Sequence, residues 1–267
     1  MNTVIEKCFK KLKIEYYGVL DYSDCKESSP SIMAREHFKP ESAIVFLVPY
    51  YVDKPENISV YAASRDYHIV IRELCDSLID CLRAEYPDAS FHGYGDHSPI
   101  YEVGAALSLG LGILGDNGLI INEKYGSYVF VADVITDISA KELGAVSPLP
   151  VQRCLHCGAC KKSCPTGILS GNSTDCLSAI TQKKGMLSED EIALIRRYGT
   201  VWGCDLCQLS CPYNRDPQST PIDFFYEERI SKLTKETLHS LSDEEFSRRA
   251  FAWRGRKVVE RNLDFFS

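Results

Sequence analysis

The sequence predicts a mixed α/β fold: an N-terminal layered α/β domain followed by a smaller cysteine-rich module. Three observations predict it. Apolar runs typical of strands alternate with helical stripes over the first 145 residues, a proline-rich break stands at 147–150, and eight of the 12 cysteines follow that break. Strands that alternate with helices are expected to build a layered domain, with an α+β arrangement as the related possibility.

The elements of the first half follow from the spacing of apolar residues. Residues 4–12 and 71–82 carry apolar side chains at helical spacing, which predicts two amphipathic helices. Residues 14–20, 43–48 and 127–135 are short apolar runs, and Pro49 stops the second one directly. Continuous apolar runs of this length are typical of buried strands.

Two cysteines in the first half, Cys8 and Cys75, lie on these helical stripes. We expect them to be plain core thiols. Disulfides are not expected, because the start of the chain lacks a basic segment followed by an apolar core, and cysteine clusters in proteins without a signal peptide are more often metal sites.

The domain ranges predicted from these patterns are 1–146 for the α/β domain, 147–225 for the cysteine module and 226–267 for a helical segment that packs back on the core. Ser188 with Glu191, and Ser242 with Glu245, have the spacing of helix capping boxes. We expect the second box to open the last helix.

The cysteines of the module form two related runs. The first run, from Cys154 to Pro165, reads C-x2-C-x2-C-x3-C-P, and the second, from Cys204 to Pro212, repeats its last three cysteines and the proline. The first run is the pattern of bacterial ferredoxins with two clusters, and Cys176 supplies the cysteine that the second run lacks. The sequence therefore predicts a bacterial ferredoxin-like module with two 4Fe–4S clusters.

The spacing also assigns ligands to the two clusters. In this motif the cysteine before proline binds the other cluster. One cluster is predicted on Cys154, Cys157, Cys160 and Cys211, and the second on Cys176, Cys204, Cys207 and Cys164. Zinc is the alternative, since it also uses paired C-x2-C, but zinc needs only four thiolates.

The overall composition sets broad limits. The net charge is −7, so the chain has no global attraction to nucleic acid, although a local basic face remains possible. No apolar run approaches the ~20 residues that a membrane helix needs. We expect a cytoplasmic protein without membrane contact.

Several further segments resemble epoxyqueuosine reductases, the cobalamin-dependent iron–sulfur enzymes of queuosine tRNA modification. They are Tyr61-Ala62, Arg65-Asp66-Tyr67-His68, Asp96-His97-Ser98-Pro99, the glycine-rich stretch 110–118, Gly126-Ser127-Tyr128, Asp175-Cys176-Leu177-Ser178, 203–208 and a closing helix at 241–262. The resemblance is ordered along most of the chain. It corresponds to a short form without the C-terminal helical-repeat domain, and Asp116 stands where the family usually has lysine.

The resemblance implies reduction of the epoxide of epoxyqueuosine in tRNA to queuosine, with two 4Fe–4S clusters and base-off cobalamin. It implies a tRNA anticodon stem-loop as substrate and an external low-potential electron donor of the flavodoxin or ferredoxin type. The residues that it places near the corrin ring are Arg65, Asp96, Ile121, Ala132, Ser178, Cys204 and Asp205. Lys183 and Lys184 match positions that could meet the RNA backbone, where a point charge suffices.

The resemblance also implies that Asp96 is the catalytic proton donor. The alternative is an ordinary turn aspartate before a helix with Ser98 as its cap and Pro99 at its first position. The glycines of the 110–118 stretch would allow a large flat cofactor to approach the backbone.

Two other functions remain open at this stage. One is a cobalamin-dependent reductase of a small molecule, related to reductive dehalogenases, and the other is a ferredoxin-like electron carrier. Cobalamin binding would separate the carrier from the two enzymes, and turnover of an epoxyqueuosine-bearing stem-loop would separate the enzymes from each other.

Overall fold

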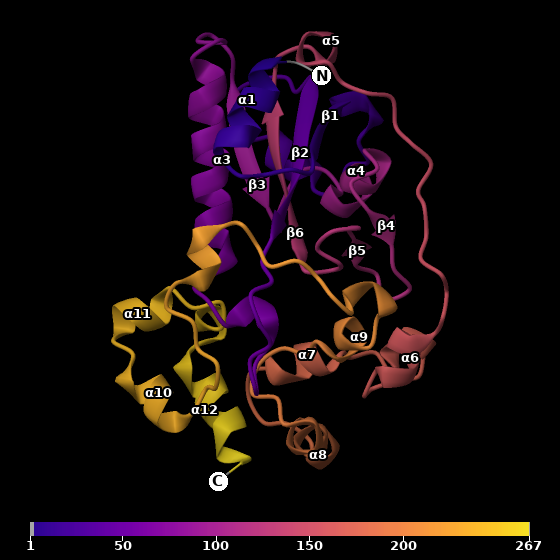
Figure 1. Ribbon diagram of the computed structural model, residues 1–267. Coiled ribbons are helices and arrows are strands. Elements are labelled where there is room, and N and C mark those ends of the chain that lie inside the picture. The colour runs from indigo at the N-terminus through magenta and orange to yellow at the C-terminus, as the bar shows by residue number, and fades with distance from the viewer. Residues whose placement is uncertain (1–2, 267) are drawn as a thin grey trace. The chain divides into compact units, whose positions relative to one another are not determined.

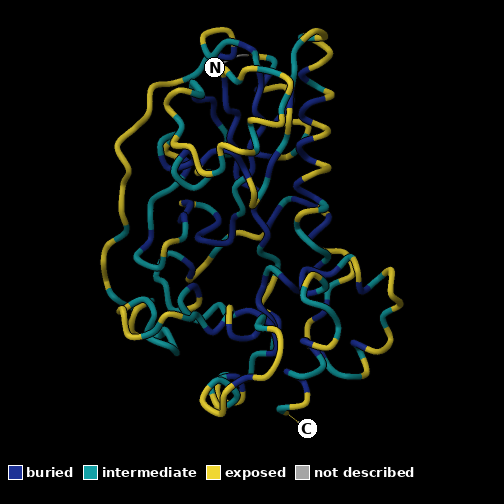
Figure 2. The backbone as a smooth tube through the Cα atoms, turned by 180° about the vertical axis from the view of Figure 1, so that it is seen from behind, coloured by how far each residue is buried: buried dark blue, intermediate teal, exposed yellow. Residues whose placement is uncertain are grey.

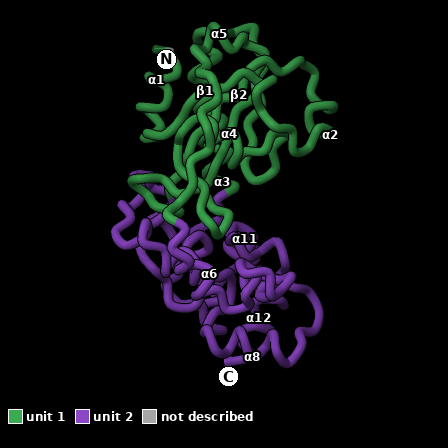
Figure 3. Tube along the Cα trace, turned by 90° about the vertical axis from the view of Figure 1, so that its right-hand side faces the viewer, with its two compact units in different colours: residues 1–49, 68–155 green, residues 50–67, 156–267 purple. Residues whose placement is uncertain are grey.

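The structure is a computed structural model that describes residues 3–266, and these divide into two compact units (Figure 3). Unit 1 contains the chain up to Pro49 and residues 68–155, and unit 2 contains residues 50–67 and the chain from His156 onward. The ranges 1–146, 147–225 and 226–267 remain a prediction about domains. The compact units divide the chain differently, because the segment 50–67 belongs with the C-terminal half.

Unit 1 is built on a four-stranded sheet of order β1-β2-β6-β3, in which every neighbouring pair is antiparallel. The strands are β1 (Tyr17–Asp21), β2 (Ser42–Pro49), β3 (Phe91–Gly95) and β6 (Val129–Thr136). The mixed α/β class is confirmed, and the antiparallel pairing makes the unit an α+β arrangement. The long apolar runs of β2 and β6 arise because the two central strands are covered on both faces.

Helices cover the two faces of this sheet (Figure 1). On one face Phe9 of α1 (Thr3–Lys11) contacts Phe46 of β2, with ring centroids 5.4 Å apart. On this face Gly95 lets α3 (Tyr67–Arg83) approach β3, because a Cβ at Gly95 would lie 2.5 Å from Ile71. Residues of α3 alternate between buried and exposed along the helix, as expected for an amphipathic helix (Figure 2).

The opposite face packs against α4 (Glu102–Ser108), whose buried Ala105 and Ala106 share a core cluster with Val45 and Leu47 of β2. The remaining elements of unit 1 are η1 (Tyr22–Asp24), α2 (Pro30–Met33), α5 (Ala140–Leu143) and the short hairpin β4 (Ile113–Leu114) with β5 (Ile120–Ile121).

The strands and helices expected in unit 1 are present, but the prediction for Cys8 was wrong. Cys8 of α1 forms a disulfide with Cys81 of α3. Cys81 lies beside the apolar stripe of α3, between the buried Ile79 and Leu82, and is only partly buried. Neither sequence segment alone therefore indicated that the two thiols meet. Cys75 is a buried free thiol, as predicted, and burial raises its pKa above the ordinary value.

Unit 2 consists of short helices. They are η2 (Val60–Ala62), α6 (Ala159–Ser163), η3 (Ile168–Ser170), α7 (Leu177–Thr181), α8 (Glu189–Tyr198), α9 (Leu206–Leu209), η4 (Pro212–Asn214), η5 (Asp223–Tyr226), α10 (Lys235–Ser240), α11 (Asp243–Ser247), η6 (Ala252–Arg254) and α12 (Arg256–Asp264). Both predicted capping boxes are present, at α8 and α11. However, α11 is not the last helix, and residues 241–262 hold two helices joined by η6 rather than one.

The core of unit 2 is centred on Trp202, which is fully buried and packs edge-on against Phe251 at 6.1 Å between ring centroids. The segment 50–67 contacts this core through an isolated bridge between Ile58 and Trp202, just before η2. Ser59 donates its N–H to the Trp202 carbonyl at 2.8 Å, and Val201 donates to the Asn57 carbonyl at 2.7 Å. These bonds explain why this segment belongs to unit 2.

Asn262 is a fully buried polar side chain of α12 that ties three segments together. Its amide donates to the carbonyls of Thr181 at 2.7 Å and Val201 at 2.8 Å. Leucine has a similar volume but cannot donate, so Asn262→Leu leaves both carbonyls buried without this donor.

We expect Asn262→Leu to lower the free energy of unfolding by roughly 2 kcal/mol or more, since an unmade buried hydrogen bond costs about 1–3 kcal/mol. Urea denaturation measures this loss. Asn172→Leu, at an exposed position, is the matched control and should change little. Equal unfolding midpoints for the two variants would contradict the structural role of Asn262.

Within residues 3–266, no helix combines the length and the apolar character that crossing a membrane requires.

Candidate functional site

Each cysteine run is folded around a short helix of unit 2. Cys160 lies in α6 and Cys164 follows it directly, while Cys207 lies in α9 and Cys211 caps the N-terminus of η4. Cys176 is the N-terminal cap residue of α7. The residue before a proline is biased away from helical backbone, so Pro165 and Pro212 help to end α6 and α9.

The two runs face each other through a pair of equivalent serines. Ser163 and Ser210 each precede the cysteine of a Cys-Pro pair, and their hydroxyl oxygens are 2.8 Å apart. Ser163 also hydrogen-bonds the Leu206 carbonyl of the other run at 3.1 Å. This cross-link between α6 and α9 is the geometry that a crossed ligand assignment needs, because it places the end of each run beside the other run.

The thiol of Cys204 is held close to two other cysteines of the predicted second cluster. Burial, together with the proximity of Cys176 and Cys207, raises the pKa of Cys204 to about 12. A buried thiol that lies beside two other cysteines needs a nearby cation before it can act as a thiolate ligand. The donor set therefore fits a metal cluster.

Cys164 has the opposite electrostatic environment. Burial alone would raise the pKa of its thiol, but backbone N–H groups of Leu169, Thr166 and Gly167 and the Thr166 hydroxyl outweigh burial, and the pKa is lowered. Donors aimed at a ligand sulfur stabilise its thiolate and tune a cluster.

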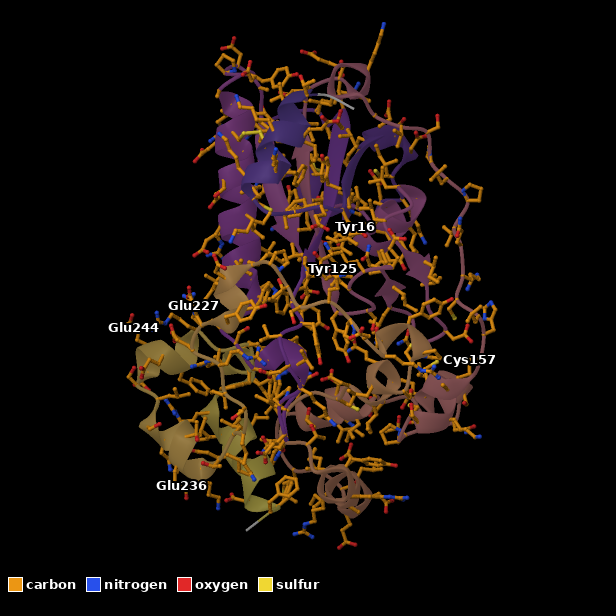
Figure 4. The ribbon with its side chains drawn as sticks, in the orientation of Figure 1. Tyr16, Tyr125, Cys157, Glu227, Glu236 and Glu244 are labelled. Carbon is orange, nitrogen blue, oxygen red and sulfur yellow. A yellow bond between two sulfur atoms is a disulfide. The ribbon has the colours of Figure 1, made fainter. Side chains whose placement is uncertain are left out.

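The other cluster cysteines differ in exposure and location. Cys157, labelled in Figure 4, is exposed, whereas the other seven are of intermediate exposure. Cys154 belongs to unit 1, where its N–H donates to the Leu114 carbonyl of β4 at 3.0 Å.

Asp96 lies on a turn directly after β3. Its backbone adopts the left-handed conformation, with φ of 68°, which is uncommon for a residue other than glycine. Its side chain is 66% exposed, and its Oδ2 is 3.5 Å from Nε2 of His68 on α3. An exposed carboxyl beside an imidazole forms a pair that can hold and transfer a proton.

The helix predicted to start at Ser98 starts later, with Tyr101 as its cap, so the prediction of Ser98 as a helix cap was wrong. Ser98 is buried, and its hydroxyl donates to Oδ2 of Asp133 at 3.1 Å while accepting the Ile100 N–H at 3.2 Å. The Ser98 hydroxyl bonds the buried carboxyl of Asp133 and does not cap a helix.

The models of two protein families match parts of the chain. A 4Fe–4S double cluster binding domain matches residues 153–214, and the family described as epoxyqueuosine reductase QueG, DUF1730, matches residues 34–96. The epoxyqueuosine reductase of Pseudomonas aeruginosa is 31% identical, with 88% of this chain and 68% of that protein covered. This chain belongs to the epoxyqueuosine reductase family.

Other members of this family are longer. The epoxyqueuosine reductase of Listeria monocytogenes is 34% identical over 74% of this chain but only 53% of its own length, and the chain spans about half the length of several curated relatives that it matches.

The family fold is also seen in solved structures. Two of them, one titled as carrying an epoxyqueuosine-modified tRNA stem loop and one from Bacillus subtilis titled as having its catalytic aspartate loop swung out of the active site, give TM-scores of 0.77 and 0.76. They are 23% and 24% identical, and each comparison covers 98% of this chain and 79% of the other.

The other residues that the family resemblance places near a corrin lie in both units. Ile121 and Ala132 are buried in unit 1, on β5 and β6. In unit 2, Ser178 accepts a hydrogen bond from Gln182 at 3.1 Å, and Arg65 stacks over Phe224 at 4.3 Å. Arg65 also pairs with Glu227, which Figure 4 labels.

Asp205 has a structural role within unit 2. Its carboxylate accepts hydrogen bonds from the Ser59 hydroxyl, from the Val60 N–H at 2.7 Å and from the Gln208 amide at 3.2 Å. Asp205 therefore fixes the segment 50–67 beside the second cysteine run.

The two candidate RNA-contacting lysines differ. Lys183 bridges Asp175 and Glu191, at 2.6 Å from each, whereas Lys184 is exposed. Lys184 is therefore the more accessible of the two cations.

Sequence reasoning missed two acids that lie next to the Asp96 turn. Glu102 accepts the backbone N–H of Asp96 at 3.1 Å, and Asp133 is fully buried in β6. An acid inside the apolar run 127–135 was a signal for Asp133. Glu102 gave none, because its bond to Asp96 depends on where the turn places a backbone amide.

Burial raises the pKa of Asp133 well above its ordinary value, with the nearby Glu102 acting in the same direction and the Ser98 hydroxyl opposing. Its Oδ1 has no hydrogen-bond partner among residues 3–266. The folded state therefore holds the Asp133 proton more tightly than the unfolded chain does. The stability of the folded state falls as the pH rises above about 4, where an unfolded aspartate ionises.

We expect Asp133→Asn, which has no proton to lose, to gain stability relative to the parent as the pH rises from 5 to 7, by up to about 1.4 kcal/mol per pH unit. Urea denaturation at three pH values measures this slope. Asp88→Asn, at an exposed position, should show no such slope. A pH-independent difference between Asp133→Asn and the parent would show that Asp133 ionises normally.

Proposed function

We propose that this chain reduces the epoxide of epoxyqueuosine in tRNA to the alkene of queuosine. The observation that carries the proposal is Asp96: an exposed carboxyl, held on a turn next to the imidazole of His68, in a member of this family. Reduction of an epoxide to an alkene consumes two electrons and two protons and releases the oxygen as water. The site must therefore supply protons where the oxygen departs.

Asp96 is the proposed proton donor. Its Oδ2 would hold the proton that the leaving oxygen takes, and His68, with Nε2 at 3.5 Å, would return a proton to the carboxylate. The exposure of Asp96 leaves its carboxyl accessible to a substrate. By analogy with the swung-out loop named for the Bacillus subtilis relative, we propose that the Asp96 turn also moves between two positions.

The cofactors proposed are two 4Fe–4S clusters on the eight cysteines, in the crossed assignment, and base-off cobalamin. When bound, cobalamin would supply a strongly reducing cobalt centre for epoxide opening, and the clusters would carry single electrons. Arg65, Ile121, Ala132, Ser178, Cys204 and Asp205 are the residues proposed near the corrin.

The glycine-rich stretch supplies one test of whether cobalamin fits. Gly118 has a φ of 82° and no atom within 4 Å of the position where a Cβ would lie, so its backbone is open to a flat ligand. Gly112 is different, because a Cβ there would lie 2.7 Å from the Ile121 carbonyl oxygen of β5. Gly118 therefore supports the proposed role, while the absence of a side chain at Gly112 is explained by packing.

The proposed partners are a tRNA anticodon stem-loop and a low-potential electron donor of the flavodoxin or ferredoxin type. A modified base stacked in a helix cannot reach a recessed cofactor, so the substrate nucleoside must be in a loop or flipped out. Lys184 and Lys183 are the proposed backbone contacts, with Lys184 the accessible one.

The experiment is turnover of a synthetic anticodon stem-loop that carries epoxyqueuosine. Protein reconstituted anaerobically with iron, sulfide and cobalamin is mixed with the RNA and a chemical reductant, and the RNA is analysed by mass spectrometry. We expect its mass to fall by one oxygen atom, and omission of cobalamin should abolish the change. Unchanged RNA with fully loaded protein would overturn the proposal and favour a small-molecule substrate.

A further inference from the structure

The turn that carries Asp96 is contacted by a side chain from α4. The N–H of Asp96 donates to Oε1 of Glu102 at 3.1 Å. A non-glycine residue in the left-handed conformation is intrinsically unfavourable and persists only where its surroundings hold it. This hydrogen bond acts at the strained residue itself.

Glu102 is well placed to hold the turn, because its own position is fixed. It opens α4, and Ala105 and Ala106 of the same helix are buried against the sheet. The residue before it, Tyr101, donates its N–H to the Lys26 carbonyl at 2.8 Å. The glutamate carboxyl therefore projects from an anchored element, whereas the Asp96 side chain is 66% exposed.

The surroundings of Glu102 contain other acidic groups. Asp96 and Asp133 both interact electrostatically with Glu102, and the Cys75 thiol of α3 does so more weakly. Burial, with a smaller contribution from Asp96, raises the pKa of Glu102 to about 7, although the Asp96 N–H opposes the shift. Burying an acid beside other acids costs free energy, and the hydrogen bond from the Asp96 N–H offsets part of that cost.

We propose that Glu102 is a positioning residue that latches the Asp96 turn through this carboxyl–amide hydrogen bond and so keeps the Asp96 carboxyl beside His68. The inference rests on the proposed function for the role of Asp96 as acid. The inference goes beyond that function because it names Glu102 as the residue that favours one of the two proposed positions of the Asp96 turn. Breaking the latch releases the turn without removing the acid.

The test compares two kinds of substitution at Glu102. In Glu102→Gln the amide oxygen still accepts the Asp96 N–H, so the latch is kept. Glu102→Leu and Glu102→Ala both remove the acceptor, and the second variant covers the case in which leucine disturbs the packing of α4. Glu73→Gln, at an exposed position of α3, is the matched control.

The primary readout is amide hydrogen exchange, followed by mass spectrometry, in the full chain with its clusters loaded. We expect exchange over residues 94–98 to be about tenfold faster in Glu102→Leu and Glu102→Ala, and unchanged in Glu102→Gln and Glu73→Gln. Exchange over β6 should be the same in all variants, which shows that the sheet is intact. Equal exchange over 94–98 in all variants would overturn the latch.

Turnover of the stem-loop RNA is the second readout. We expect the latch-breaking variants to lose about tenfold in kcat with KM within twofold, and Glu102→Gln to restore it, because the turn affects the acid rather than RNA binding. If the parent protein shows no turnover while the exchange difference is present, the proposed function fails and the latch stands. If the parent turns over and exchange does not respond to Glu102, the latch fails and the function stands.

Discussion

Asparagine in place of Asp96 should lower turnover of the epoxyqueuosine-bearing stem-loop by roughly 10²–10⁴-fold, the usual loss when a positioned general acid is removed. Asparagine keeps the size and shape of the side chain and the backbone N–H that Glu102 accepts, but it has no acidic proton. The measurement is single-turnover conversion of the RNA by protein loaded with clusters and cobalamin.

Two controls separate loss of the proton donor from loss of the cofactors and from a nonspecific effect of substitution. Iron content, cobalamin binding and reduction of the bound cobalt by a chemical donor should be unchanged in Asp96→Asn, because electron transfer precedes protonation. Asp88→Asn, at an exposed position, should turn over like the parent. Near-normal turnover of Asp96→Asn would assign the proton to another group, with His97 and water the next candidates. Loss of cobalamin would show that Asp96 binds the cofactor instead.

Loss of a single cluster ligand is the second large effect that we expect. If the runs exchange ligands, Cys211→Ala should damage the same paramagnetic signal as Cys157→Ala, and Cys164→Ala should damage the signal lost in Cys207→Ala. The link between Ser163 and Ser210 supports this pairing, because it joins the ends of the two runs. Iron analysis should show close to eight irons in the parent.

The measurement is electron paramagnetic resonance of the dithionite-reduced proteins, with iron and sulfide assayed on the same samples. Cys75→Ala, which removes a buried thiol outside the module, should keep both signals. If Cys211→Ala instead groups with Cys207→Ala, the crossed assignment is wrong. Stoichiometric zinc in place of iron would remove both clusters.

The spacing of residues along the chain predicted those features whose partners are close in sequence. The capping boxes at Ser188 and Ser242 were predictable because a cap joins residues three positions apart. The helices at 4–12 and 71–82 were predictable because one face of each is buried. The disulfide between Cys8 and Cys81 was not predictable, because its partners are 73 residues apart and meet only when α1 and α3 pack on the same face.

By itself, the sequence determined the cysteine pattern and the family, and it supplied Asp96 as the candidate acid. The cysteine pattern is visible because the chemistry of cluster ligation fixes spacing along the chain. Only the tertiary structure decided the antiparallel order of the sheet, the membership of residues 50–67 in unit 2, and the hold of Glu102 on the Asp96 turn. Each of these depends on a hydrogen bond between segments that adopt their relative positions only when a shared core is buried. A spacing pattern records which residues are near in sequence, and it carries no information about which backbone amide a distant carboxylate will meet.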